Sequence, residues 1–322
     1  MANTTPSVAT ARAVALVAAR REPAEQLGSS LAELINQPDE FATALRQGLV
    51  KLADPECLEG QRRVAPGIGA ILGVRWPLLA AVDRGFRQAT RRDRATTMLF
   101  LADRLFREQE LELRWFAFGL LERTLATDPE RTWQLMRRAA REAGDWITVD
   151  SLAHPYGTGI AQEPYRWAEL ELLVYSPSRW ERRLIGSTIA TMTHGGRKTG
   201  RDPELPEKAL ALLRELIGDA EADVQKALSW AYRSLAPLDP TRTAAALDAE
   251  TNIAVTNEDG HRAWVIRDSL SKLDPSIAEP LRERLAGIRK RSGAGPTSRA
   301  SATSSRFGDL PDPSNHPEPP LT

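Results

Sequence analysis

Two tryptophans, one aspartate and one arginine form a set of side chains that suits chemistry on a sugar–phosphate substrate. The four residues are Trp146, Asp150, Arg183 and Trp230. A carboxylate can stabilise positive charge that develops in a transition state, and an indole ring can stack on a cation. A guanidinium can bind a phosphate through paired hydrogen bonds. We therefore interpret these residues as the centre of a nucleic-acid enzyme that stabilises a positively charged sugar.

Each of the four residues also has an ordinary structural interpretation. Trp146 and Asp150 are four positions apart and share one face of a helix, where a core tryptophan beside an exposed acid is common. Arg183 follows other arginines and fits a solvated basic face, and Trp230 fits a helical core. The functional interpretation therefore depends on the four residues occurring together.

Basic residues near these positions are candidates for contacts with a DNA backbone. Some lie in the same segments as the tryptophans, and two lie in a glycine-rich loop at residues 194–201. The candidates are Arg179, Arg182, Lys226, Arg233, Arg197 and Lys198. The loop fits a plain connector equally well.

The composition of the whole chain limits the classes of function. The 322 residues include 43 Lys and Arg and 43 Asp and Glu, so any attraction for phosphate must come from a local patch. Cys57 is the only cysteine, which excludes an internal disulfide and a cysteine-based zinc cluster. The histidines are scattered, and we expect no metal and no cofactor. No apolar run approaches the roughly 20 residues of a membrane span. We expect a cytoplasmic monomer.

Helical periodicity predicts an all-α fold. Apolar residues recur every three or four positions, as at Leu210, Leu213 and Ile217. Pairs such as Asp202-Pro203 and Asp239-Pro240 place a capping acid before a proline that suits the first helical turn. Helix pairs that recur at roughly 40 residues predict a HEAT-like repeat α-solenoid with a concave DNA-binding face. A helical bundle is the main alternative.

Composition divides the chain into three parts. Residues 1–21 are small and polar, and we expect a flexible N-terminus. Residues 22–290 carry the helical pattern and form the predicted repeat domain. Residues 291–322 are rich in Pro, Gly and Ser and cannot bury enough apolar surface to offset chain entropy, so we expect a disordered tail.

Five segments between about Gly73 and about Pro240 carry a family pattern when they are taken in order. They read LGVRWP, ELRWFAFGLL, WITVD, WERR and QKALSWAYR, and they begin at Leu72, Glu112, Trp146, Trp180 and Gln225. In this order they resemble the AlkD-type DNA alkylation repair family, the HEAT-like alkylpurine DNA glycosylases. A single motif of this kind has little specificity, but five in the right order are more specific.

The resemblance implies a role for each residue of the set. In the family the matching acid lies near the anomeric carbon of the damaged nucleotide, which assigns that role to Asp150. The matching tryptophans contact the deoxyribose, which assigns Trp146 and Trp230. The matching arginine helps to hold the DNA backbone, which assigns Arg183.

The activity that the resemblance implies is base excision repair of alkylated DNA. The substrate would be double-stranded DNA with cationic N3- or N7-alkylated purines. Asp150 would stabilise the oxocarbenium-like sugar and orient water, and the lesion would not need to be flipped out of the helix. Two departures concern the range of substrates. Asp145 stands where the family can have another aromatic residue, and Val64 falls near an aromatic residue that shapes the pocket in relatives.

Two rival functions stay open. One is a non-catalytic HEAT-repeat module that binds damaged or branched DNA. The other is a protein-interaction scaffold, which would show no affinity for DNA at low salt. A base-release assay separates the first rival from a glycosylase, and a binding measurement separates the second rival from both.

Overall fold

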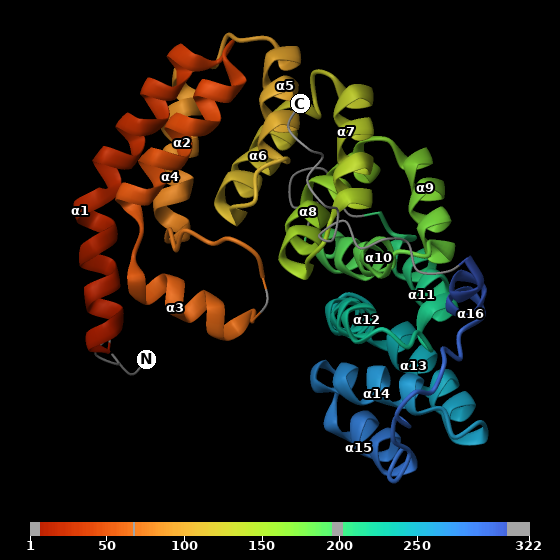
Figure 1. Ribbon diagram of the computed structural model, residues 1–322. Coiled ribbons are helices and arrows are strands. Elements are labelled where there is room, and N and C mark those ends of the chain that lie inside the picture. Colours follow the sequence, from red (N-terminus) through yellow and green to blue (C-terminus); the bar gives the residue numbers. More distant parts are fainter. Residues whose placement is uncertain (1–6, 67, 195–201, 308–322) are drawn as a thin grey trace. The chain divides into compact units, whose positions relative to one another are not determined.

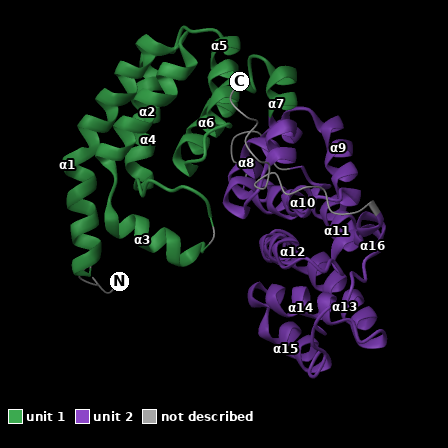
Figure 2. Ribbon diagram, viewed as in Figure 1, with its two compact units in different colours: residues 1–135 green, residues 136–322 purple. Residues whose placement is uncertain are grey.

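The computed structural model describes residues 7–66, 68–194 and 202–307. Helices dominate this part of the chain, and it contains no strand (Figure 1). The predicted all-α fold is therefore confirmed. Where we expected one repeat domain over 22–290, the chain forms two compact units, Met1–Leu135 and Met136–Thr322 (Figure 2). Within the described ranges, no helix is both long enough and apolar enough to cross a membrane.

The described residues of unit 1 form six helices and the start of a seventh. The six are α1 (Val8–Leu31), α2 (Pro38–Leu52), α3 (Pro55–Val64), α4 (Trp76–Ala89), α5 (Ala95–Leu105) and α6 (Leu111–Thr124). Helix α1 packs along α4, and α5 packs on α6. The α1–α4 contact needs glycines, because a Cβ added at Gly28 or Gly85 would lie 1.9 or 2.0 Å from a backbone oxygen of the other helix. Close packing of the two backbones thus fixes α1 on the unit.

The N-terminal residues differ from the expected flexible segment 1–21. Helix α1 already begins at Val8, where Ser7 accepts a hydrogen bond from the Thr10 amide. Its sequence is rich in alanine and arginine, which favour helix. Arg20 also donates a hydrogen bond of 2.7 Å to the carbonyl of Ala53 at the end of α2. Residues 1–6 lie outside the described part of the chain.

Unit 2 contains the helices that carry the candidate site. They are α8 (Trp146–Gln162), α9 (Trp167–Leu172), α10 (Arg179–Met192), α11 (Leu205–Leu216), α12 (Ala222–Leu235), α13 (Pro240–Thr256), α14 (Gly260–Ser269), α15 (Pro275–Arg284) and α16 (Arg299–Ser304). Helix α7 (Pro129–Glu142) crosses the boundary between the units. Short 3₁₀ turns occur at Ala32–Leu34, Pro164–Arg166, Leu173–Tyr175, Leu270–Lys272 and Ser305–Phe307.

Two layers of helices stack within unit 2. Helices α8, α10, α12 and α14 contact one another in that order, and α11, α13 and α15 do the same. Such stacking of consecutive helix pairs is what HEAT-like repeats predict. The predicted N-cap is confirmed at Asp239, which accepts a hydrogen bond from the Arg242 amide at the start of α13. At Asp202 it is not, because α11 begins only at Leu205.

The C-terminal segment corrects the expected disordered tail over 291–322. The Ser301 hydroxyl donates a hydrogen bond of 2.7 Å to the Asp219 carboxylate, and the Thr297 amide donates to a backbone carbonyl of unit 2 at 2.8 Å. The sequence suggested disorder because serine and glycine bury little apolar surface. Small polar residues can instead pack closely when a buried carboxylate accepts their hydroxyls. Residues 308–322 lie outside the described part of the chain.

Candidate active site

A capping aspartate sets the start of the helix that carries the candidate acid. Asp145 Oδ1 accepts a hydrogen bond of 2.8 Å from the Thr148 amide, and Oδ2 accepts one of 2.7 Å from the Thr148 hydroxyl. These bonds satisfy donors that a helix N-terminus leaves without partners. Trp146 is therefore the first residue of α8, and Asp150 lies one turn later on the same face of the helix, as their spacing predicted. Asp145 thus has a structural role as the N-cap of α8.

The Asp150 carboxylate is held by two side chains of α10. Arg183 Nε donates to Oδ1 at 3.0 Å, and Arg183 Nη2 donates to Oδ2 at 2.7 Å. The Ser187 hydroxyl donates to Oδ1 at 2.5 Å. Oδ1 thus accepts two hydrogen bonds and Oδ2 one. The Asp150 side chain keeps 19% of its surface exposed, so the carboxylate is both oriented and accessible.

Arg183 ties three helices of unit 2 together. In addition to its contact with Asp150 on α8, its Nη1 donates a hydrogen bond of 2.6 Å to the backbone carbonyl of Asp223 on α12. Its Cζ lies 5.7 Å from the centroid of the Trp146 ring. Only 6% of its side chain is exposed. The guanidinium is therefore engaged inside the protein, which differs from the expected role of Arg183 in holding the DNA backbone.

The two tryptophans lie on different helices of the same layer. Trp146 is half-buried beside the Arg183 guanidinium. Trp230 is also half-buried and follows Asp223 by seven residues on α12. Seven residues are about two turns, or roughly 10 Å of helix, so both residues lie on one face of α12. The face that receives Arg183 therefore also carries Trp230.

Among the basic residues predicted to contact DNA, Arg182 has the environment of a structural residue. It is buried, and its Nε lies 2.7 Å from Asp219 Oδ2. Its Nη1 donates to the carbonyls of Ser176 and Pro177 at 2.8 and 3.0 Å. Because these contacts enclose the guanidinium, Arg182 is not available to DNA, and we withdraw it from the candidate contacts. The position of Arg182 in a run of arginines on α10 did not indicate that its side chain is buried.

The other described candidates are on the surface. Arg179 is exposed, and its Cζ lies 4.7 Å from the Trp180 ring centroid. Lys226 is exposed and lies one helical turn before Trp230. Arg233 is ion-paired with Asp268. Arg197 and Lys198 lie outside the described residues.

Two contributors to the site escaped the sequence analysis, namely Ser187 and the backbone of Asp223. Ser187 is fully buried, and it follows Arg183 by four residues, which puts both side chains on the same face of α10. That spacing was the available signal. A serine one turn after an arginine is an ordinary pair in a helix, so the spacing alone could not select it.

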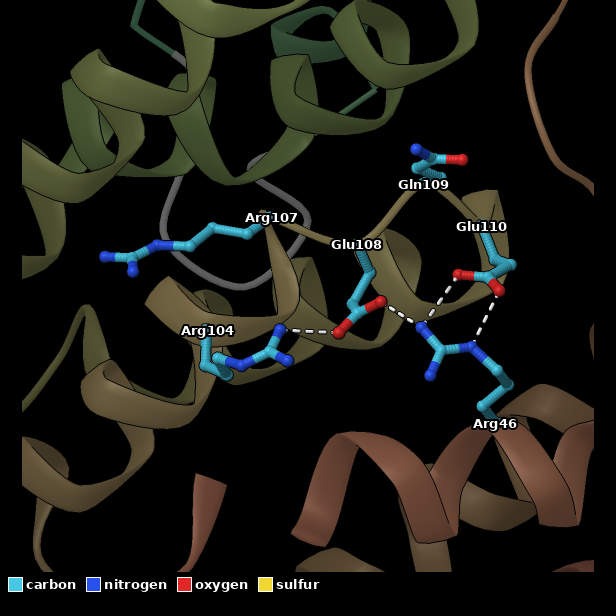
Figure 3. A pocket seen from close by; sticks show the side chains of 6 residues that line it. All are labelled: Arg46, Arg104, Arg107, Glu108, Gln109 and Glu110. Atoms are coloured by element: carbon cyan, nitrogen blue, oxygen red, sulfur yellow. Dashed lines mark hydrogen bonds and ion pairs between the residues drawn. The ribbon is translucent and has the colours of Figure 1, made fainter. Parts of the chain in front are cut away.

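A separate cavity of about 500 Å³ lies in unit 1 (Figure 3). Its lining residues are Arg46, Arg104, Arg107, Glu108, Gln109 and Glu110. Arg46 is ion-paired with both Glu108 and Glu110, and Arg104 is ion-paired with Glu108. The hydrogen bond from Arg46 lowers the pKa of Glu110 below its usual range. Since the central charges neutralise one another, this network joins helices and is a weak candidate for ligand binding.

In the described ranges, no group of three or more His, Cys, Asp or Glu residues is arranged to hold a metal ion. The candidate active site of unit 2 comprises one carboxylate, its hydrogen-bond donors and the two tryptophans. Groups of this kind can act through charge and orientation.

Comparisons with known proteins agree with this fold. The family model described as "DNA alkylation repair enzyme" matches residues 45–273, well over half of the chain. Among solved structures, AlkD2 from Streptococcus mutans is similar with a TM-score of 0.50 and 15% sequence identity, and the match covers 74% of this chain and 100% of that one. At this identity the similarity concerns the fold alone. A search of curated proteins gave no match.

Proposed function

Because this chain belongs to the family of DNA alkylation repair enzymes, we propose that it is a DNA glycosylase acting on cationic N3- or N7-alkylated purines in duplex DNA. The observation that carries this proposal is the Asp150 carboxylate, which is oriented by Arg183 and Ser187 and remains partly exposed. Trp146 lies beside the Arg183 guanidinium that holds this carboxylate. These features supply an anion and an aromatic face at one place.

The charge of the lesion explains why a carboxylate suffices. Alkylation at N3 or N7 gives the purine a positive charge and makes it a better leaving group. When the glycosidic bond breaks, positive charge moves to the sugar, as in glycoside hydrolysis. A fixed carboxylate favours the transition state more than the ground state, because the cation forms only as the bond breaks. Asp150 would provide that anion and would orient the attacking water.

Arg183 and Ser187 would keep the carboxylate in place before the reaction begins. A group that does not have to reorient when charge develops stabilises the transition state more effectively. Because Oδ1 already accepts two hydrogen bonds, Oδ2 is the oxygen with capacity for the sugar or for water. The indoles of Trp146 and Trp230 would offer faces to the developing cation, while the lesion stays stacked in the helix.

A single-turnover assay with a duplex that contains 7-methylguanine tests this function. We expect Asp150→Asn to lower the rate of base release by at least about a hundredfold, the scale of removing one electrostatic contact in an active site. Affinity for the same duplex should stay within about threefold, because Asn preserves the shape of the side chain. Base release by Asp150→Asn at nearly the wild-type rate would refute the proposal.

One observation favours the non-catalytic alternative. The bidentate contact with Arg183 neutralises part of the negative charge of Asp150, and such a pair also occurs as a purely structural link. A DNA-binding module of this kind would bind alkylated or branched duplexes without release of 7-methylguanine or 3-methyladenine. Binding and base release should therefore be measured on the same wild-type preparation.

A further inference from the structure

Four cationic side chains at one end of unit 2 have no acidic partner. They are Lys226, Arg267, Arg289 and Lys290, and none forms an ion pair within the described residues. Their hydrogen bonds go to neutral oxygens. Arg267 Nη1 donates to the Leu285 carbonyl at 3.1 Å, and Lys290 donates to the side-chain oxygen of Gln225. Their hydrogen-bonding needs are thus partly met, but their charges are not compensated.

Each of the four charges lies within the electric field of at least one of the others. Burial lowers the pKa of Lys290 below its usual range, and the charges of Lys226 and Arg267 lower it further. Burial also lowers the pKa of Arg267, and the charge of Arg289 adds to that effect. Mutual repulsion of this kind disfavours a cluster unless an anion offsets it. We refer to these four residues below as the cation cluster.

The cation cluster is held by a firm support. Lys290 Nζ lies 4.2 Å from the centroid of the Trp264 ring on α14, and Lys290 is hydrogen-bonded to Gln225, which is fully buried. The backbone at Arg289 rests directly on α14, because a Cβ added at Gly260 would lie 2.2 Å from the Arg289 carbonyl oxygen. Lys226 and Arg267 lie on α12 and α14, and these contacts anchor Arg289 and Lys290, which follow α15, against the same two helices.

Other arginines near the cation cluster do have acidic partners, so the uncompensated positive charge is a local property of the cluster. Arg233 is ion-paired with Asp268, Arg284 with Asp248, and Arg291 with Glu258. The chain as a whole has equal numbers of acidic and basic residues. An excess of positive charge at one place in a neutral chain attracts an anion to that place.

The geometry points to the cation cluster as a phosphodiester site that holds the DNA backbone beside the lesion, and this inference rests on the proposed function. Lys226 precedes Trp230 by four residues and follows Asp223 by three, so the three residues lie on one face of α12. Lys226 and Trp230 are about 6 Å apart along the helix axis. The cluster thus adjoins the surface that carries the candidate active site.

The salt dependence of DNA binding reports how many phosphates the cation cluster contacts. Each phosphate contact that is neutralised contributes about 0.9 to the slope of log K against log salt concentration. For the full chain with Lys226→Gln and Arg289→Gln, two exposed positions, we expect a slope shallower by about 2 and weaker binding of an undamaged duplex. The matched control is Arg284→Gln with Arg291→Gln, which removes the same charge from ion-paired residues. The control should keep the wild-type slope.

Uncharged replacements for single phosphates then distinguish a direct contact between the cation cluster and the DNA backbone from long-range electrostatic attraction. Methylphosphonate linkages are placed one at a time along the duplex. We expect one or more positions to weaken binding of the wild type but not of the Lys226→Gln, Arg289→Gln variant. If no position shows this coupling, or if the control loses as much salt slope as the cluster variant, the inference is wrong. Because the measurement uses undamaged DNA, it stands apart from base release. A wild type that releases no base would refute only the proposed function.

Discussion

At the scale of single residues, the candidate site depends on which atoms the Asp150 carboxylate leaves free. The spacing of Trp146 and Asp150 predicted that they share a helical face, and the structure agrees. The partner of Asp150 was not predictable, because a run of arginines on α10 does not reveal which of them point inward. Arg182 and Arg183 are adjacent, yet both are buried and each binds a different acid.

Ser187 should act as a positioning residue for Asp150. Ser187→Ala removes a buried hydroxyl from Oδ1, and we expect base release to slow by about tenfold, since a hydrogen bond to a charged group contributes about 1.5 kcal/mol or more. Affinity for the duplex should not change. Thr188→Val is the matched control, because the Thr188 hydroxyl is buried and forms no hydrogen bond in the described structure. Single-turnover rates and binding constants of both variants check this prediction, and equal rates would contradict it.

Arg183 should affect catalysis and stability more than affinity for DNA. Arg183→Lys retains the charge but loses the planar, two-pronged contact with Asp150. We expect a lower rate of base release and a lower melting temperature, with duplex affinity within about threefold of wild type. An arginine that held a phosphate would give the opposite pattern, in which affinity falls first. Binding titrations and thermal unfolding of this variant therefore decide between the two roles.

At the scale of helices, the sequence predicted the type of each element more accurately than the residues at which it begins and ends. The capping acids are informative where they stand next to the first helical residue, as at Asp239, and less so at Asp202, which lies three residues before α11. Helix α16 was missed because Ser-rich composition resembles that of a disordered chain. The elements that hold it, among them Asp219 and α11, lie about 80 or more positions away along the sequence.

The cap of α8 links helix stability with the position of Trp146. Asp145→Ala removes both hydrogen bonds to Thr148 and should destabilise the protein by about 1 kcal/mol. Because Trp146 is the first residue of the helix, fraying there should also slow base release. Asp145→Ser can restore the cap and should recover most of both losses. Thermal unfolding and single-turnover rates of the two variants test this link.

At the scale of the whole molecule, an all-α repeat fold followed from helical periodicity, and the family followed from five short segments in order. The division into two compact units did not follow, because the helical pattern is continuous through α7. The expected concave DNA-binding face remains a prediction. The neutral net charge also concealed the cation cluster, because a sum over the chain does not show where charges gather.

Unit 1 should lose stability in acid through the network around Arg46. The pKa of Glu110 is lowered by its hydrogen bond to Arg46, so near the usual Glu range the unfolded chain binds more protons than the folded one. The stabilisation is complete at neutral pH and is lost as the pH falls through the lowered pKa of the folded state. Arg46→Gln should flatten this dependence. Melting temperatures from pH 7 to pH 3 check it, and identical slopes for both proteins would contradict it.

Trimming this protein for expression or crystallisation calls for care at its C-terminus. A low-complexity filter would cut before the Ser- and Pro-rich stretch, yet Ser301 and Thr297 from that stretch bind unit 2. A chain cut at residue 290 would leave Asp219 with one fewer hydrogen-bond donor and would expose the surface of α11 and of Leu173–Tyr175 on which α16 packs. A stop codon after Phe307 would retain α16 and is the safer place to shorten the gene.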